Sequence, residues 1–323
     1  MNRRQLILGA IASTFSGYAA HAQSGYPEKN IRLVVPFPPG GNVDTVARLI
    51  APRFASALGV GVIIENRGGA SGIIGSENVA RAPADGYTIL LVGSNHGINS
   101  STYKKLPYDT QKDFKSIGFI GAVPMVLVVS KKLPVKTFAE LIDYGRAHSG
   151  VLNFGITPGA ANHLATALMI KQTGIDALMV PYKGDGPTII DLLGGHINCY
   201  IGISSLLRQH IESDSVMPIA VTSEQPIAIF PTLPTLKDSG LDDYVVGSWN
   251  GLVAPAGVSP EKSEKLSKCL QETLQDEKVS SALSGLGMQV VNGDPKYLDR
   301  FIQREIERWP SVVAGANIER QEL

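Results

Sequence analysis

The sequence lacks the surplus of basic residues that nucleic-acid-binding proteins carry. Its 29 Lys and Arg residues balance 29 Asp and Glu residues, so the formal net charge is zero. Binding to nucleic acid needs a basic stripe or patch, and this balance argues against one. Charged residues make up 18% and hydrophobic residues 44% of the 323 positions, which excludes intrinsic disorder. Beyond the N-terminal segment, no apolar run is long enough to span a membrane.

Motifs of catalysis and cofactor binding are missing as well. The stretch GISSL at residues 202–206 lacks the final glycine of a nucleophile elbow. No His-Glu-x-x-His pattern occurs, and the five histidines after residue 22 lack the spacing of metal ligands. The glycine-rich stretch at 65–75 meets neither the P-loop pattern nor the Rossmann spacing. We therefore expect no catalytic residue, no metal and no cofactor.

The N-terminal residues 1–22 have the three parts of an export signal. Arg3 and Arg4 supply positive charge, an apolar stretch begins at Leu6, and Ala20 and Ala22 frame a small-x-small cleavage pattern. The apolar stretch is too short and too often interrupted by polar residues for a membrane anchor. We expect cleavage after Ala22 and a mature protein outside the cytoplasm. The paired arginines leave the twin-arginine route open beside the general secretory route.

Apolar runs rich in β-branched residues alternate with helical patterns along the rest of the chain. This alternation is typical of an α/β fold with mostly parallel sheets. About ten strands approach the limit for one open sheet, so we expect two sheets in two lobes. A strand at 117–130, broken at Pro124, would leave one lobe for the other, and a crossing near 246–255 would return the chain. The predicted strands are 31–37, 60–65, 88–93, 119–123, 125–130, 152–155, 178–181, 197–203, 219–222 and 244–252, and the predicted helices are 42–58, 73–82, 137–148, 161–174, 186–194, 260–276, 278–286 and 295–318.

The sharpest local feature is a loop in which a buried strand leads through prolines and two glycines directly into a helix. Residues 34–44 read VVPFPPGGNVD. Gly40 and Gly41 let the backbone approach a ligand, and the first N–H groups of the helix have no partners within it. A helix start favours an anion by about 0.3–1 kcal/mol in exposed settings. An ordinary tight turn is the alternative interpretation.

A second loop, at residues 153–164, has the same construction. The letters NFG end a strand, ITPGAA follows, and NHL enters a helix. Thr157 adds a hydroxyl and Asn162 an amide to the exposed N–H groups. For His163, in the first turn of the helix, we favour a structural hydrogen bond over direct contact with a ligand. Two such loops, one in each lobe, would hold a carboxylate between two helix starts without an arginine.

Two further features have both a structural and a functional interpretation. Asp44 lies four residues before Arg48, so the two side chains suit an ion pair along one helix face. Alternatively, Asp44 orients the glycine loop or meets an amino group of the ligand. The glycines within 65–75 resemble a phosphate cradle, but we assign them to close packing between helix and sheet.

Six motifs follow one another in the order found in a known protein family. They are PFPPGGNVDTVAR at 36–48, ENRGGASG at 65–72, ADGYT at 84–88, VPYKGDGP at 180–187, DLLGG at 191–195 and WNGLVAPAG at 249–257. The first resembles P-F-x-x-G-G-x-x-D-x-x-A-R, the second resembles E-N-R-P-G-A-G-G with Gly68 in place of proline, and the fourth resembles V-P-Y-K-G-x-x-P. The set resembles the Bug family, the extracytoplasmic solute receptors of tripartite tricarboxylate transporters.

The resemblance implies a two-lobed α/β fold of the periplasmic-binding-protein type, often called a Venus flytrap. Each lobe would be a mostly parallel sheet flanked by helices, and crossing strands would join the lobes. Residues 23–124 and 251–323 would form lobe 1, and residues 125–250 would form lobe 2. A small carboxylate would bind in the cleft between them without chemical change. Cys199 and Cys269 would fall in different lobes, where a bridge would restrict hinge motion, so we expect free thiols.

Carboxylate capture by the two loops, partly through water, is a further implication of the resemblance. The second loop departs from the family's frequent S-x-G-x-G-S pattern, because Pro158, Ala160 and Ala161 replace polar or glycine positions. Asp185 stands at a position that varies in the family, and we expect it at the far end of the ligand. The expected ligand-binding residues are Phe37, Pro38, Pro39, Gly40, Gly41, Asp44, Ser94, Asn95, Thr157, Pro158, Gly159, Ala160, Ala161, Asn162, His163, Lys183, Gly184, Asp185 and Asp191.

The sequence thus predicts a periplasmic receptor that acts as a monomer and delivers a small carboxylate to integral membrane subunits of a transporter. Two alternatives stay open at this point. One is a receptor that presents its ligand to a signalling protein. The other is an exported hydrolase or lyase whose active site lies between the lobes.

Overall fold

The computed structural model describes residues 25–316 and 318–323, so the predicted signal peptide lies outside the described residues. The strands are β1 (Ile31–Val35), β2 (Val62–Asn66), β3 (Thr88–Gly93), β4 (Phe114–Ser130), β5 (Leu152–Ile156), β6 (Ala177–Pro181), β7 (Cys199–Ile203), β8 (Val216–Val221), β9 (Gly247–Pro255) and β10 (Gln289–Gly293). The α-helices are α1 (Asn42–Leu58), α2 (Ile73–Ala80), α3 (Asn95–Thr102), α4 (Phe138–Ala147), α5 (Ala161–Thr173), α6 (Asp185–Gly194), α7 (Ser204–Glu212), α8 (Pro260–Gln275), α9 (Glu277–Gly285) and α10 (Pro295–Gly315). None of these helices has the length and apolar character needed to cross a membrane.

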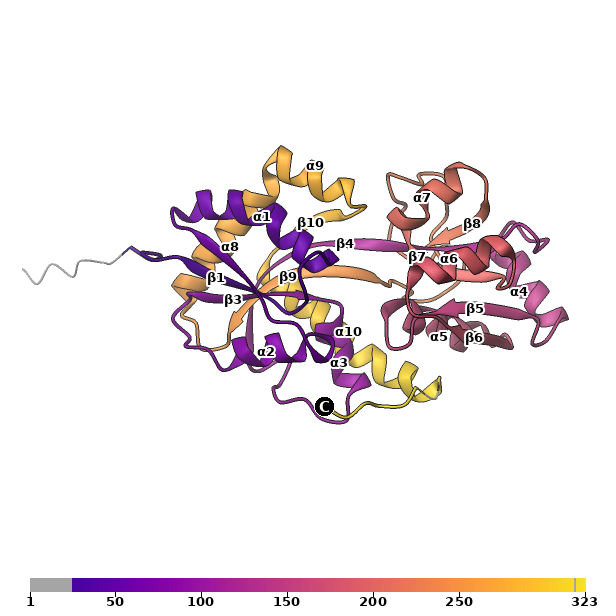
Figure 1. Cartoon of the computed structure of the whole chain (residues 1–323), viewed down its shortest axis with the longest axis horizontal. Coiled ribbons are helices and arrows are strands. Elements are labelled where there is room, and N and C mark those ends of the chain that lie inside the picture. The colour runs from indigo at the N-terminus through magenta and orange to yellow at the C-terminus, as the bar shows by residue number, and fades with distance from the viewer. Residues whose placement is uncertain (1–24, 317) are drawn as a thin grey trace, which may run out of the picture.

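These elements form two lobes that lie side by side along the long axis of the molecule (Figure 1). Lobe 1 contains β1, β2, β3 and β10 with the helices α1, α2, α3, α8 and α9. Lobe 2 contains β5 to β8 with the helices α4 to α7. Strand β4 runs through both lobes, and β9 leads back into lobe 1. The two-lobed α/β fold is as predicted, while the exact residue boundaries of the lobes stay a prediction.

Strand pairing explains how both lobes present their loops. The ten described strands form one hydrogen-bonded sheet in the order β2-β1-β3-β9-β4-β7-β5-β6, with β8 and β10 also paired to β4. The expectation of two separate sheets is thus corrected, because β4 joins the strands of both lobes. Strands β1 to β3 are parallel, as are β5 to β7, whereas β4 and β9 run antiparallel to their neighbours. In parallel sheets the loops that follow the strands gather at one edge, which is where ligands bind. Each lobe therefore offers one such edge.

Strand β4 is continuous, which corrects the expected break at Pro124. Residues 114–124 pair with β9, and residues 125–130 pair with β7 and β8. Proline cannot donate to a strand ladder, so it is tolerated only where no regular ladder bond is needed. Pro124 lies at the point where β4 changes partners, opposite Gly247. A Cβ atom on Gly247 would come within 2.8 Å of the Val123 carbonyl oxygen, so this crossing is tight.

Each lobe has its own apolar core, and the two cysteines are divided between them. Cys269 packs with β1, β3 and α1 in lobe 1, and Cys199 packs with β5 and α5 in lobe 2. Both are buried and free, as predicted.

Helix α10 links the lobes in addition to the strands. Its first half contributes Leu298 and Ile302 to an apolar cluster of lobe 1. Its second half places Trp309, Val312 and Val313 in the core of lobe 2. The helix also contains Pro310, which removes one backbone donor from its interior.

Three elements, α3, α7 and β10, are not predicted from the sequence. Helix α3 reads NHGINSST, which contains poor helix formers, and packing holds it in place instead. It lies against α10 so closely that a Cβ atom on Gly97 would come within 2.7 Å of the Glu305 Cβ. Tertiary contact has here overridden local propensity.

Candidate functional site

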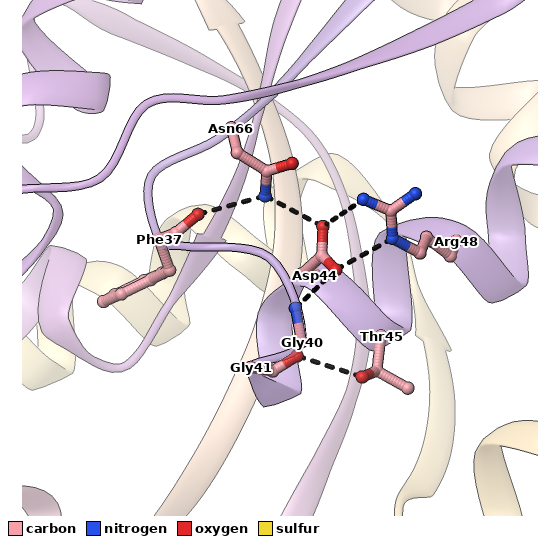
Figure 2. Close-up of polar contacts among 7 residues, drawn as sticks. All are labelled: Phe37, Gly40, Gly41, Asp44, Thr45, Arg48 and Asn66. Atoms are coloured by element: carbon pink, nitrogen blue, oxygen red, sulfur yellow. Dashed lines mark hydrogen bonds and ion pairs between the residues drawn. The ribbon is translucent and has the colours of Figure 1, made fainter.

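The first loop is fixed from within by the carboxylate of Asp44, which is 1% exposed (Figure 2). Asp44 Oδ2 accepts hydrogen bonds from the Gly40 backbone N–H at 2.9 Å and from Arg48 Nε at 2.8 Å. Asp44 Oδ1 accepts from Asn66 Nδ2 at 2.8 Å and from Arg48 Nη2 at 3.1 Å. Asn66 Nδ2 also donates to the Phe37 carbonyl at 3.0 Å, which ties the loop to β2.

The Asp44 carboxylate thus forms the ion pair of the structural interpretation and also orients the glycine loop, which was part of the functional alternative. The hydrogen bond from Arg48 lowers the pKa of Asp44 to about 2, against the opposing effect of burial. Both carboxylate oxygens are occupied by groups of the protein itself. This geometry makes Asp44 a residue that positions the loop.

Glycines behind the loop allow close backbone packing, in line with the structural interpretation. A Cβ atom on Gly75 would come within 2.7 Å of the Arg67 carbonyl oxygen and 2.8 Å of Pro36 Cα. Only glycine fits at this contact between α2 and the end of β1.

The second loop is held by the side chains at the start of α5. Asn162 Oδ1 accepts from the Thr157 N–H at 3.2 Å, and His163 Nδ1 accepts from the Gly159 N–H at 3.1 Å. Burial lowers the pKa of His163, which favours the neutral ring that can accept this bond. His163 therefore makes the predicted structural hydrogen bond. Two buried polar atoms, Thr157 Oγ1 and Asn162 Nδ2, have no hydrogen-bond partner in the described part of the chain.

A cavity of about 250 Å³ between the lobes brings the two loops together. Of the residues predicted to bind the ligand, those that line this cavity are Phe37, Ser94, Asn95, Thr157, Ala160, Ala161, Asn162, Gly184 and Asp185. The predicted residues that do not line it are Pro38, Pro39, Gly40, Gly41, Asp44, Pro158, Gly159, His163, Lys183 and Asp191. Sequence reasoning missed the lining residues Val43, Gly93, Met125, Ile203 and Ser248. These are small or apolar, and Met125 and Ser248 belong to the strands that join the lobes.

Five of the described helices begin at this cavity, and none of the five has a side-chain cap. They are α1, α3, α5, α6 and α7, whose starts contribute Val43, Ser94, Ala160, Gly184 and Ile203 to the lining. Helices α4, α8, α9 and α10 begin elsewhere and are capped by the side chains of Thr137, Ser259, Asp276 and Asp294. Helix α2 is uncapped although it does not border the cavity. The first N–H groups of a helix need partners from outside it, so unpartnered donors gather around this cavity.

The lining residues carry no lysine or arginine, and Asp185 is their one ionisable side chain. Its Oδ1 accepts a hydrogen bond from the Tyr200 hydroxyl. The neighbouring Asp191 accepts from the Tyr182 hydroxyl at 2.7 Å, outside the cavity. The groups of this lining that can attract an anion are therefore backbone and amide dipoles.

No group of three His, Cys, Asp or Glu side chains in residues 25–316 and 318–323 is arranged to hold a metal ion.

A two-lobed α/β fold with a cavity between its lobes, ringed by helix starts, defines a receptor of the periplasmic-binding-protein type. The chain belongs to the family described as the tripartite tricarboxylate transporter family receptor, TctC, whose model matches residues 46–318. The resemblance to this family is thereby confirmed. The family description and the solved neighbours name receptors and binding proteins, so the chain is a receptor and not an enzyme.

Individual relatives match over nearly the whole length. Protein BugT of Bordetella pertussis is 34% identical over 316 residues, which cover 97% of each chain. The structure of R. palustris Rpa4515 with adipate is 34% identical, with a TM-score of 0.73, and the match covers 92% of this chain and 100% of that one. A TctC solute-binding protein from Polaromonas, solved with no ligand, is 26% identical with a TM-score of 0.82, covering 90% and 99%.

Proposed function

We propose that this protein is a periplasmic receptor that captures a small carboxylate between its lobes and delivers it to the membrane subunits of a tripartite carrier. The observation that best supports this proposal is that five helices without a side-chain cap begin at one cavity. Capture leaves the ligand chemically unchanged. The mature chain begins after Ala22 and acts as a monomer.

The uncapped helix starts supply the attraction for the carboxylate. Each offers backbone N–H donors and a partial positive charge, which stabilises an anion by about 0.3–1 kcal/mol when exposed and up to about 2 kcal/mol when partly buried. Thr157 and Asn162 line the same cavity, and each has one buried side-chain atom, Thr157 Oγ1 and Asn162 Nδ2, without a partner in the described residues. Asp44 and His163 act indirectly, by holding the backbone of the two loops in place.

The kinship with Rpa4515 supports a carboxylate as the ligand, since that protein was solved with adipate. The family description supports transport as the destination of the ligand. Together these favour a transport receptor over a receptor that serves signalling.

Binding closes the lobes over the ligand. The ligand shifts the population towards the closed arrangement, in which it contacts both lobes.

The test is a thermal-shift screen of the mature protein against mono-, di- and tricarboxylates, amino acids and aromatic acids, because a bound ligand raises apparent stability by mass action. The best ligand is then compared by calorimetry with the same molecule carrying a carboxamide. Loss of the charge should cost about 1.5–3 kcal/mol, as for hydrogen bonds to a charged group. An amide that binds as tightly would contradict anion recognition by the helix starts.

A further inference from the structure

Asp185 places a carboxylate of the protein itself in the cavity. It is half-buried, lies in the first turn of α6 and lines the cavity next to Gly184. In the described residues no lysine, arginine or histidine forms an ion pair with it. Lys183 precedes it in the chain but is exposed and does not line the cavity.

The Tyr200 hydroxyl holds this carboxylate from behind. Tyr200 is fully buried on β7 and donates to Asp185 Oδ1. Burial, and then the charge of Asp185, raise the pKa of Tyr200, so the hydroxyl keeps its proton and stays a donor. No partner is found for Asp185 Oδ2 in the described residues. One oxygen is therefore anchored, and the other remains available as an acceptor.

The carboxylate of Asp185 also lies at the start of α6, which is one of the five helix starts at the cavity. Asp185 makes no cap hydrogen bond, but its charge in the first turn offsets the partial positive charge at the start of α6. The starts of α1, α3, α5 and α7 remain for the carboxylate of a ligand. A second ligand carboxylate at α6 would meet a like charge, in a cavity whose lining contains no cation to offset it.

We propose that Asp185 makes this receptor selective for a small monocarboxylate that carries a hydrogen-bond donor, an ammonium or a hydroxyl group, at its other end. Dicarboxylates such as adipate are disfavoured. This inference rests on the proposed function, because it requires the ligand carboxylate to bind at the other helix starts. A neighbour solved with adipate would lead to the expectation that dicarboxylates are preferred, and this inference gives the opposite preference.

Calorimetric titration of the mature protein with a set of five-carbon ligands of similar length tests the selectivity. The set contains pentanoate, glutarate, 5-aminopentanoate and 5-hydroxypentanoate, and the three- to six-carbon homologues repeat it at other lengths. At the length that binds best, the amino or the hydroxy acid should bind at least about tenfold more tightly than the dicarboxylate. If the dicarboxylate binds as tightly as the amino acid and the hydroxy acid of that length, the inference is wrong.

The variant Asp185→Asn keeps the size of the side chain and an acceptor for Tyr200 but removes the charge. It should bind the amino acid more weakly and the dicarboxylate more tightly, each by about tenfold or more. Asp185→Ser provides a second variant with the same expected direction, and a thermal melt of each shows that it folds. Asp176→Asn is the matched control, since it removes one charge from an exposed position of lobe 2.

The results distinguish a failure of the role of Asp185 from a failure of the proposed function. Carboxylate binding without the expected selectivity, or selectivity that Asp185→Asn leaves unchanged, overturns the role of Asp185 alone. If none of the three- to six-carbon ligands binds but another carboxylate of the thermal-shift screen does, this inference is wrong and the proposed function stands. Binding of no carboxylate in that screen overturns the proposed function, and this inference with it.

Discussion

The helices of this protein begin in two different ways, and for all the described α-helices except α2 the difference follows their place in the fold. Helices α4, α8, α9 and α10 start away from the cavity with a Ser, Thr or Asp whose side chain accepts from the first turn. Helices α1, α3, α5, α6 and α7 start at the cavity with no such cap. A helix start without a side-chain cap is less stable than a capped start by roughly 1 kcal/mol. This comparison supports the proposal that a ligand supplies the missing acceptor at the cavity.

The largest expected effect comes from adding a cap at the cavity. Ala160 has the extended backbone of an N-cap residue, so Ala160→Asp should stabilise the fold by about 1 kcal/mol. The same carboxylate would occupy donors meant for the ligand and weaken binding by about 2–3 kcal/mol. Urea unfolding and calorimetry measure the two effects. Ala160→Ser, a neutral cap, is the control and should lose less affinity; equal affinity of the Asp variant and the parent would contradict the comparison.

The second prediction removes the carboxylate that positions the first loop. Asp44→Ala leaves the Gly40 N–H and the Asn66 amide without their acceptor, which should lower the free energy of unfolding by about 2 kcal/mol and loosen the ligand site. The folded-state pKa of Asp44, about 2, lies below its ordinary value of 3.8. Its contribution is therefore present above about pH 4 and is lost as the pH falls towards 2. Urea unfolding across this range should show a smaller loss in the variant than in the parent.

The third prediction removes caps outside the cavity. Ser259→Ala and Asp294→Ala should each lower the free energy of unfolding by about 1 kcal/mol, because the first turns of α8 and α10 lose their acceptors. Ligand affinity should not change, since neither helix begins at the cavity. A loss of affinity in either variant, measured by calorimetry, would contradict this expectation and show that these caps also affect ligand binding.

The smallest effect on stability is expected at Gly41, the N-cap of α1. Its backbone is extended, and a Cβ atom would meet only the Pro38 carbonyl oxygen, at 3.7 Å. Gly41→Val should lower the free energy of unfolding by only about 0.5 kcal/mol, because there is room for the side chain although valine is a poorer N-cap residue than glycine. The branched side chain should still weaken ligand binding several-fold by crowding the N–H groups of α1. Unchanged affinity would remove the first loop from the site.

Much of the fold could be predicted from the sequence because strand and helix patterns alternate clearly along it. The continuous β4 could not, since the tolerance of Pro124 depends on the change of strand partners around it. Helix α3 could not either, because packing of Gly97 against α10 holds a sequence of poor helix formers.

The site was predicted where local loop chemistry defines it and missed where distant strands complete it. Thr157 and Asn162 lie at a glycine-containing helix start that the sequence marks plainly. Met125 and Ser248 line the cavity only because the joining strands pass beneath it, and an apolar or small residue in a strand gives no local sign of this. Four of the five cavity starts have Gly, Ala or Ile as the N-cap residue, which cannot cap through a side chain. The fifth, α3, has Ser94, whose hydroxyl instead donates to the Gly247 carbonyl and accepts from the Trp249 N–H, and the sequence gives no sign of this.

The segments that join the lobes hold both tryptophans of the chain. Trp249 lies on β9, beside the lining residue Ser248, and its ring is stacked 6.0 Å from that of Phe119. Trp309 lies on α10, where the helix enters the core of lobe 2. Trp249 also lines a pocket together with Ser223 and Val246, so we expect a rotation of the lobes to change the surroundings of its indole ring. Its fluorescence would then report closure without an attached dye, and Trp309→Phe would assign the emission change to the β9 crossing.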